Sequence, residues 1–137
     1  MIRFAVQDDI ELLLRHDHEV PRDVMARKIA NRQVYIVLED QERVGWLRYG
    51  LLWDLVPFMN MLYVLAPYRS KGYGRQLVER WEKDMRASGY RVLVTSTLSD
   101  ESAQHFYRKL GYIDTGALLL PGEATEIIMR KDIRESK

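Results

Sequence analysis

The sequence predicts one α/β domain in which a mixed, mostly antiparallel central sheet is flanked by about four helices, in the order βααβββαβαββ. Two observations carry this prediction. Apolar strand-like runs alternate with amphipathic helical segments, and no Pro/Gly/Ser-rich linker interrupts them. A chain of 137 residues with 47% apolar composition also has the size of a single domain, here residues 1–137.

The first half of the chain is predicted as a strand, two helices and three further strands. Ile2, Phe4 and Val6 alternate as a strand does, and Met25 and Ile29 share the inward face of a helix that starts at Pro21. The expected elements are strand 2–6, a helix from residue 10 capped by Asp8 or Asp9, helix 21–30, and strands 34–38, 44–49 and 58–64. The last of these is almost wholly apolar, so we expect it to be buried on both faces.

The second half is predicted as helix, strand, helix and hairpin. Leu77, Trp81 and Met85 recur every four residues, which is the strongest helical signal in the chain, and Gly89 ends that helix. The remaining expected elements are a short buried strand at 92–94, a helix behind Ser99 or Asp100 that turns Ala103, Phe106, Tyr107 and Leu110 inward, and a hairpin of strands 112–119 and 125–130.

Composition excludes several classes of protein. Cysteine is absent, which rules out a disulfide scaffold, a thiolate zinc site and a cysteine nucleophile. Neither a signal peptide nor an apolar run of membrane-spanning length is visible, so a cytoplasmic location is expected. Net charge is only +1, but residues 67–91 hold seven basic and three acidic side chains. A local basic patch on a neutral chain favours a small anionic ligand over nucleic acid.

The segment that joins strand 58–64 to the following helix has the features of a phosphate-binding loop. Gly72 and Gly74 allow a ligand to approach the backbone closely, and the first turn of a helix presents N–H groups without intrahelical acceptors. The cationic side chains of Arg69, Lys71 and Arg75 and the positive end of the helix dipole favour a diphosphate there. The alternative is a glycine turn with solvated charges. Neither the P-loop nor the dinucleotide-binding pattern fits these residues.

A second segment, together with the loop, carries a family resemblance. Arg69-x-x-Gly72-x-Gly74 after an apolar strand is followed by Ala103-x-x-Phe-Tyr107-x-x-x-Gly111-Tyr112. The pair of motifs resembles the Gcn5-related N-acetyltransferase (GNAT) superfamily from about residue 34 to residue 130. The resemblance implies the acyl-CoA N-acyltransferase fold and acetyl-CoA as co-substrate, with no metal.

The resemblance also implies roles for individual residues. Backbone groups of Leu62, Tyr63 and Val64 would pair with the pantetheine arm of acetyl-CoA. The pyrophosphate would be held by the loop residues Arg69, Ser70, Lys71, Gly72, Tyr73, Gly74 and Arg75, chiefly through the N–H groups of residues 71–75. Tyr107 would protonate the departing CoA thiolate, since a phenol is still protonated at neutral pH. The alternative for Tyr107 is that of a core aromatic residue.

The chain departs from the family pattern in three places, and no general base is assigned. Asp100 replaces an asparagine that contacts the cofactor, and we interpret it as a helix cap. Thr95 occupies the position of a glutamate base in members that acetylate protein N-termini, and Pro67 falls one place late in the loop. Asp54 and Glu39 remain candidate bases.

Other candidates are weaker. Asn60 is a candidate for orienting a water, and Trp46 and Trp53 are more typical of packing than of an acceptor pocket. The run 16–19 (His-Asp-His-Glu) is not expected to bind metal, although in the family this region borders the acceptor pocket.

The function that the resemblance implies is that of an N-acetyltransferase, which moves the acetyl group of acetyl-CoA to a primary amine by direct attack. The acceptor is either a small molecule or a protein amine, and neither nucleic acid nor membrane is an expected partner. A homodimer is compatible with the sequence. The first alternative is a CoA-binding sensor that lacks turnover, favoured by the missing base. The second is a nucleic-acid module that uses helix 75–86, which the acids Glu79, Glu82 and Asp84 disfavour.

Overall fold

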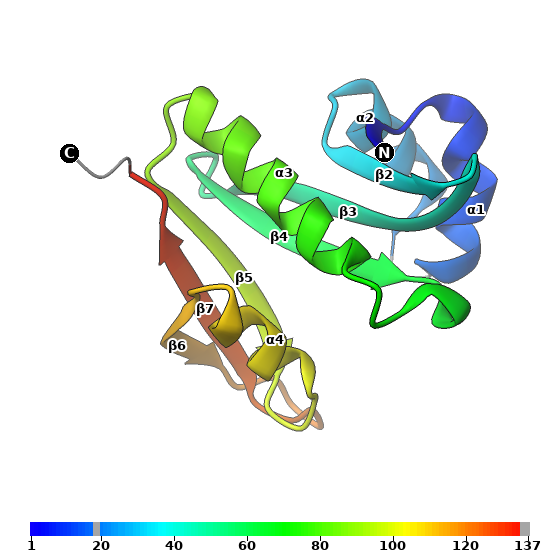
Figure 1. The fold of residues 1–137 in the computed structure, drawn as a ribbon. Coiled ribbons are helices and arrows are strands. Elements are labelled where there is room, and N and C mark those ends of the chain that lie inside the picture. The colour runs from blue at the N-terminus through cyan, green and yellow to red at the C-terminus, as the bar shows by residue number, and fades with distance from the viewer. Residues whose placement is uncertain (18–19, 135–137) are drawn as a thin grey trace. The chain divides into compact units, whose positions relative to one another are not determined.

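The computed structural model describes residues 1–17 and 20–134, in which four α-helices and seven strands form the expected α/β fold (Figure 1). The strands make one mostly antiparallel sheet in the order β1-β2-β3-β4-β5-β7-β6. The helices are α1 (Ile10–His16), α2 (Arg22–Ala30), α3 (Tyr73–Ala87) and α4 (Ala103–Lys109). The strands are β1 (Ile2–Phe4), β2 (Val34–Glu39), β3 (Glu42–Leu52), β4 (Val56–Val64), β5 (Val92–Leu98), β6 (Ile113–Leu118) and β7 (Glu126–Asp132). Short 3-10 turns occur at η1 (Gln7–Asp9) and η2 (Ala66–Tyr68).

The chain divides into two compact units, each described by itself below. The first consists of Met1–Tyr49 and Met61–Val78, and the second of Gly50–Asn60 and Glu79–Lys137. Strand β4 and helix α3 each begin in one unit and end in the other.

The first unit is built on an apolar cluster between its two N-terminal helices and its strands. Met25 and Ile29 point inward from α2 as the sequence predicts, and Leu13 of α1 is fully buried. The cluster consists of Ala5, Leu13, Met25, Ile29, Val34, Ile36 and Trp46. Gly45 of β3 is required by close approach, since an added Cβ would lie 2.8 Å from the Tyr63 carbonyl oxygen of β4.

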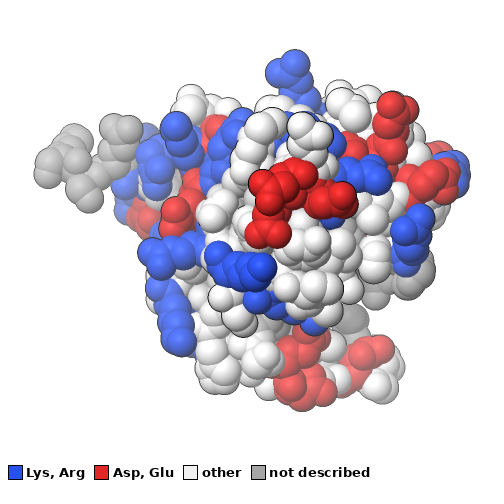
Figure 2. Space-filling model, turned by 45° about the vertical axis from the view of Figure 1, so that its right-hand side comes forward, with Lys and Arg blue, Asp and Glu red and all other residues white. Residues whose placement is uncertain are grey.

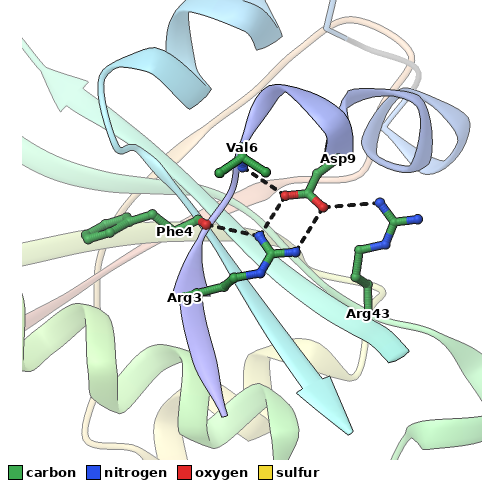
Figure 3. Close-up of polar contacts among 5 residues, drawn as sticks. All are labelled: Arg3, Phe4, Val6, Asp9 and Arg43. Atoms are coloured by element: carbon green, nitrogen blue, oxygen red, sulfur yellow. Dashed lines mark hydrogen bonds and ion pairs between the residues drawn. The ribbon is translucent and has the colours of Figure 1, made fainter. Parts of the chain in front are cut away.

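A buried carboxylate connects β1, the η1 turn and β3 in the same unit (Figure 3). Asp9 is 2% exposed and accepts two hydrogen bonds from the Arg3 guanidinium, at 2.7 and 3.1 Å, and one from Arg43 at 3.1 Å. The Val6 N–H donates to it at 2.8 Å. Asp9 does precede α1 as expected, but its carboxylate does not cap that helix. The carboxylate instead accepts hydrogen bonds from the two arginines, because a buried carboxylate needs counter-charges.

The second unit contains the paired strands β5, β7 and β6, with α4 lying against β5 (Figure 1). Its buried carboxylate Glu82, on α3, accepts a hydrogen bond from the Tyr112 hydroxyl at 2.8 Å and two from Lys131 Nζ at 3.1 Å. Glu82 is only 7% exposed, and Lys131 supplies the counter-charge that a buried carboxylate needs.

Several strands differ from the sequence-based prediction: β1 already ends at Phe4, β3 extends from Glu42 to Leu52, and β4 and β5 differ as follows. Strand β5 extends four residues beyond Val94, because Thr95 to Leu98 pair with β7 throughout, although they are mostly polar. The expectation that strand 58–64 is buried on both faces was wrong, since Asn60 is exposed and residues 61–64 are partly exposed. The ladder between β4 and β5 explains this, because it contains only the pairs Phe58–Val94 and Met59–Thr95.

The N-terminal cap of α4 also differs from the prediction. The helix begins at Ala103 with Ser102 in the cap position, so Asp100 does not cap it. Gln104 instead donates to the carbonyl oxygens of Ser99 and Glu101, both at 2.9 Å. These bonds stabilise the turn that precedes the helix.

On the face drawn in Figure 2, basic and acidic side chains are interspersed. The continuous basic field that a nucleic-acid surface needs is not seen among the described residues on that face. In the described part of the chain, no helix is long and apolar enough to span a bilayer.

Candidate active site

The loop before α3 has the backbone geometry that a phosphate-binding turn requires. Gly72 has φ +89°, and a Cβ built there meets no atom within 4 Å, so the space above this backbone is open. Ser70 also has a left-handed conformation, with φ +64°. The Gln76 N–H donates to the Gly72 carbonyl at 3.0 Å, which starts the helical hydrogen bonding directly after the loop. The N–H groups of the first turn, from Tyr73 onward, are therefore of the kind that lacks an intrahelical acceptor and binds anions at helix N-termini.

The basic side chains of this loop are engaged by the protein. Arg69 Nε donates to the Val64 carbonyl at 2.8 Å, and its guanidinium lies 5.3 Å from the centre of the Tyr63 ring. Lys71 Nζ lies 3.9 Å from Glu39 Oε1, with both side chains substantially exposed. Such a pair is weak, so an anion can compete for the lysine.

Glu39, one of the candidate bases, lies beside Lys71 and already accepts a hydrogen bond. The Tyr73 hydroxyl donates a short hydrogen bond to its carboxylate. This bond and the negative charge of Glu39 raise the pKa of Tyr73 to about 12. Glu39 therefore orders the start of α3 and is poorly placed to take a proton from a substrate.

The end of β4 provides the backbone that the family resemblance assigns to the pantetheine arm. Leu62, Tyr63 and Val64 follow the two-residue ladder with β5 and are only partly buried. The Val64 carbonyl accepts a hydrogen bond from Arg69 Nε. The Tyr63 ring stacks on Trp46 at 5.1 Å and contacts His16 at 5.3 Å. These ring contacts fix the orientation of the strand end.

Tyr107 of α4, the expected general acid, lies in an apolar and hydrogen-bonded environment in the second unit. It is 7% exposed and packs edge-on against Phe106 and Tyr112. Burial raises its pKa to about 12, against the opposing effect of a hydrogen bond with Thr95. The phenol therefore keeps its proton at neutral pH, which is what an acid for a thiolate requires. The same burial is what a core aromatic residue shows, so packing alone does not separate the two roles.

Thr95 adds a second polar group beside Tyr107. It occupies the position where some family members carry a glutamate base, and its hydroxyl donates to the Met59 carbonyl at 3.1 Å.

The remaining sequence candidates are distributed as follows. Trp46 is 1% exposed in the core, whereas Trp53 is 78% exposed and occupies the β3–β4 turn with Asp54, both at positive φ. Asn60 is exposed. In the run 16–19, His18 and Glu19 lie outside the described residues, and Asp17 is paired with Arg48 at 2.8 Å. No group of three metal-ligating side chains occurs among the residues that are described.

Sequence reasoning missed one carboxylate in the second unit. Glu126 begins β7 opposite Leu98 of β5, and its Oε1 accepts a hydrogen bond from the Ser96 hydroxyl at 3.1 Å. Its Oε2 is buried and has no hydrogen-bond partner. The only sequence signal was an acidic residue at the start of a predicted strand, which is ordinarily a solvated position.

The strand order, the glycine loop before α3 and the buried tyrosine of α4 agree with the fold that the sequence predicts, and solved structures share that fold. Ard1 from Thermoplasma volcanium superposes with a TM-score of 0.87 over 98% of each chain at 16% identity. A ribosomal-protein-alanine N-acetyltransferase from Brucella melitensis gives 0.82, at 20% identity, over 96% of this chain and 99% of that one. The yncA protein from Salmonella typhimurium, solved with its cofactor acetyl-CoA, gives 0.80 at 20% identity over 100% and 95%. At such identities these likenesses show the fold.

The profile of the Acetyltransferase (GNAT) family matches residues 5–112, and the chain belongs to that family. A search of curated proteins finds no significant match.

Proposed function

We propose that this protein transfers the acetyl group of acetyl-CoA to a primary amine by direct attack, without a covalent enzyme intermediate. Family membership carries the proposal, and the observation that supports it most directly is the open, positive-φ backbone at Gly72. The acceptor is an amine of a small molecule or of a protein.

The residues present fit acetyl-CoA as the co-substrate. The N–H groups of residues 71–75 would hold the pyrophosphate, and Arg69 and Ser70 flank them. Lys71 would exchange its weak pair with Glu39 for a phosphate oxygen. Backbone groups of Leu62, Tyr63 and Val64 would bond the pantetheine amides as an added strand does. When bound, acetyl-CoA supplies the activated thioester carbonyl.

Tyr107 is proposed as the general acid. Its hydroxyl would donate a proton to the sulfur as the C–S bond breaks, and the resulting phenolate would regain a proton from the acceptor nitrogen or from water. Burial keeps the hydroxyl protonated before that step. Much of the rate enhancement would come from holding amine and thioester together.

The cofactor part of the proposal is tested by ligand-dependent stability. Acetyl-CoA at a hundred times its dissociation constant should stabilise the fold by about 2.7 kcal/mol. Gly72→Glu should abolish that shift, because the new carboxylate occupies the open space proposed for phosphate. The matched control is Gly122→Glu, since Gly122 also has positive φ and open space around its Cβ. If both variants retain the shift, the phosphates are bound elsewhere.

Turnover is tested separately. CoA-thiol release is measured with benzylamine, spermidine, lysine amide and an alanine-terminated tetrapeptide as acceptors. Release above the acceptor-free rate supports the transferase. Binding of acetyl-CoA with no release from any acceptor would indicate the CoA-binding sensor instead.

A further inference from the structure

The carboxylate of Glu39, in the first unit, contacts the residues on both sides of the open glycine in the loop before α3. Its Oε1 accepts the short hydrogen bond from the Tyr73 hydroxyl and lies 3.9 Å from Lys71 Nζ. Lys71 and Tyr73 are the two chain neighbours of Gly72, where the positive φ leaves open space above the backbone. One oxygen atom at the end of β2 therefore meets the loop on either side of the position proposed for phosphate.

The β2–β3 hairpin fixes the position of Glu39. This residue ends β2 and pairs with Glu42, the first residue of β3. The two residues between them, Asp40 and Gln41, have φ of +49° and +71°, as a tight two-residue hairpin turn requires. Such a turn leaves little freedom to the residue that precedes it, so the hairpin is a firm support for contacts with the loop.

The two contacts of Glu39 have opposite effects on an anion in the loop. The hydrogen bond from Tyr73 fixes the first residue of α3, and with it the direction of the N–H groups in the first helical turn. The negative charge acts against binding, because it engages Lys71 and repels an anion bound nearby. Both side chains of the pair are partly exposed, so the pair is weak and a diphosphate can replace the carboxylate beside the lysine.

We infer that Glu39 is a positioning residue of the phosphate loop, which it holds through Tyr73, and that its charge lowers the affinity for the diphosphate by competing for Lys71. The inference rests on the proposed function. Without ligand, the carboxylate neutralises the lysine. On binding, the lysine turns to the diphosphate while the hydroxyl of Tyr73 stays bonded to Glu39, so the loop keeps its geometry.

The competition gives Glu39 a role in the turnover of the cofactor and not in proton transfer. Acetyl-CoA and the product CoA carry the same diphosphate, so the carboxylate weakens the binding of both equally. A lysine that returns to Glu39 as the diphosphate leaves favours the release of CoA, a step that limits the rate of many enzymes.

The test compares three variants by calorimetric titration with acetyl-CoA. Glu39→Gln removes the charge but keeps an oxygen that accepts from Tyr73, so the dissociation constant should fall about threefold. Tyr73→Phe removes the hydrogen bond but keeps the charge, so the dissociation constant should rise about fivefold. The matched control is Glu42→Gln, which removes the same charge from an exposed position of the same hairpin and should leave the dissociation constant unchanged. A purely structural role of Glu39 would weaken binding in both of the first two variants.

Salt and the choice of ligand separate charge from structure. The gain in affinity of Glu39→Gln should shrink between about 0.05 and about 0.5 M KCl, because salt screens exposed charges, whereas the loss in Tyr73→Phe should persist. The gain should also be equal for CoA and acetyl-CoA, which differ only at the sulfur.

The possible failures are distinguishable. An unchanged or weaker affinity in Glu39→Gln, a gain that salt does not reduce, or an equal gain in Glu42→Gln would overturn the competition for Lys71. An unchanged affinity in Tyr73→Phe would overturn the positioning role. Either result leaves the transferase proposal standing. If the unaltered chain binds neither acetyl-CoA nor CoA, the proposed function itself fails.

Discussion

The four hydrogen bonds that converge on Asp9 should make this carboxylate one of the largest single contributors to the stability of the first unit. Asp9→Asn keeps the side-chain shape but removes the charge that Arg3 and Arg43 share. Removing one member of a buried ion pair typically costs 3–5 kcal/mol, and the lower end applies because both guanidinium groups remain partly exposed to water. We therefore expect a loss of about 3 kcal/mol.

The same cluster predicts how stability depends on pH. Burial by itself would raise the pKa of the Asp9 carboxyl, but hydrogen bonds from Arg3, the Val6 N–H and Arg43 outweigh it and hold the pKa below its ordinary value. A depressed folded-state pKa means that the contribution is complete above the unfolded-state value of about 4. It is lost as pH falls through the lower folded-state pKa. The difference between the two proteins should thus shrink only below about pH 4.

Urea unfolding at neutral and acidic pH measures both effects, and thermal melting should show a decrease of roughly 10 °C at neutral pH. Glu11→Gln is the matched control, because Glu11 pairs with Arg22 at 2.7 Å but both side chains are exposed. Its loss should be far smaller than that of Asp9→Asn, because an exposed ion pair contributes little to stability. Equal losses in the two variants, or an Asp9→Asn deficit that does not change on acidification, would refute the reasoning.

The remaining predictions concern the second unit. Tyr107→Phe should lower turnover by about a hundredfold while sparing the acetyl-CoA-induced shift in melting temperature, and unchanged turnover would reduce Tyr107 to a packing role. Because burial raises the pKa of Tyr107 to about 12, kcat should show no loss from Tyr107 deprotonation at any pH up to about 10. A fall in kcat that begins at lower pH would show that another group is the acid. Thr95→Val keeps the shape but leaves the Met59 carbonyl without its donor, so urea unfolding should show a loss of about 1–2 kcal/mol that Thr95→Ser restores. Full stability of Thr95→Val would show that this hydrogen bond contributes nothing.

The element order was predictable because most elements have one apolar face with a clear period. Leu77, Trp81 and Met85 are all buried, as their spacing requires. Prediction failed where pairing, and not side-chain polarity, decides structure. The polar end of β5, Thr95 to Leu98, is a strand because β7 pairs with it. The apolar end of β4 is only partly buried because its ladder with β5 ends at Met59.

The backbone of the candidate site was more predictable than its side chains. Gly72 has the positive φ that a turn glycine implies, but α3 begins at Tyr73, so Gly74 and Arg75 of the predicted loop lie in its first turn. The sequence did not show which groups the charged side chains contact. Arg69 donates to the carbonyl of Val64, and Lys71 lies beside Glu39, a residue 32 positions earlier in the chain. Such partners depend on tertiary contacts that no local pattern encodes.

The same limit explains why a base cannot be assigned by position along a family motif. A general base needs a carboxylate near the acceptor nitrogen, and different strands of one sheet can provide it. At Thr95 this chain has a hydroxyl that hydrogen-bonds Met59 and Tyr107, so a carboxylate there would lose the first bond and place a negative charge beside the proposed acid. That charge would raise the pKa of Tyr107 further and weaken proton donation to sulfur.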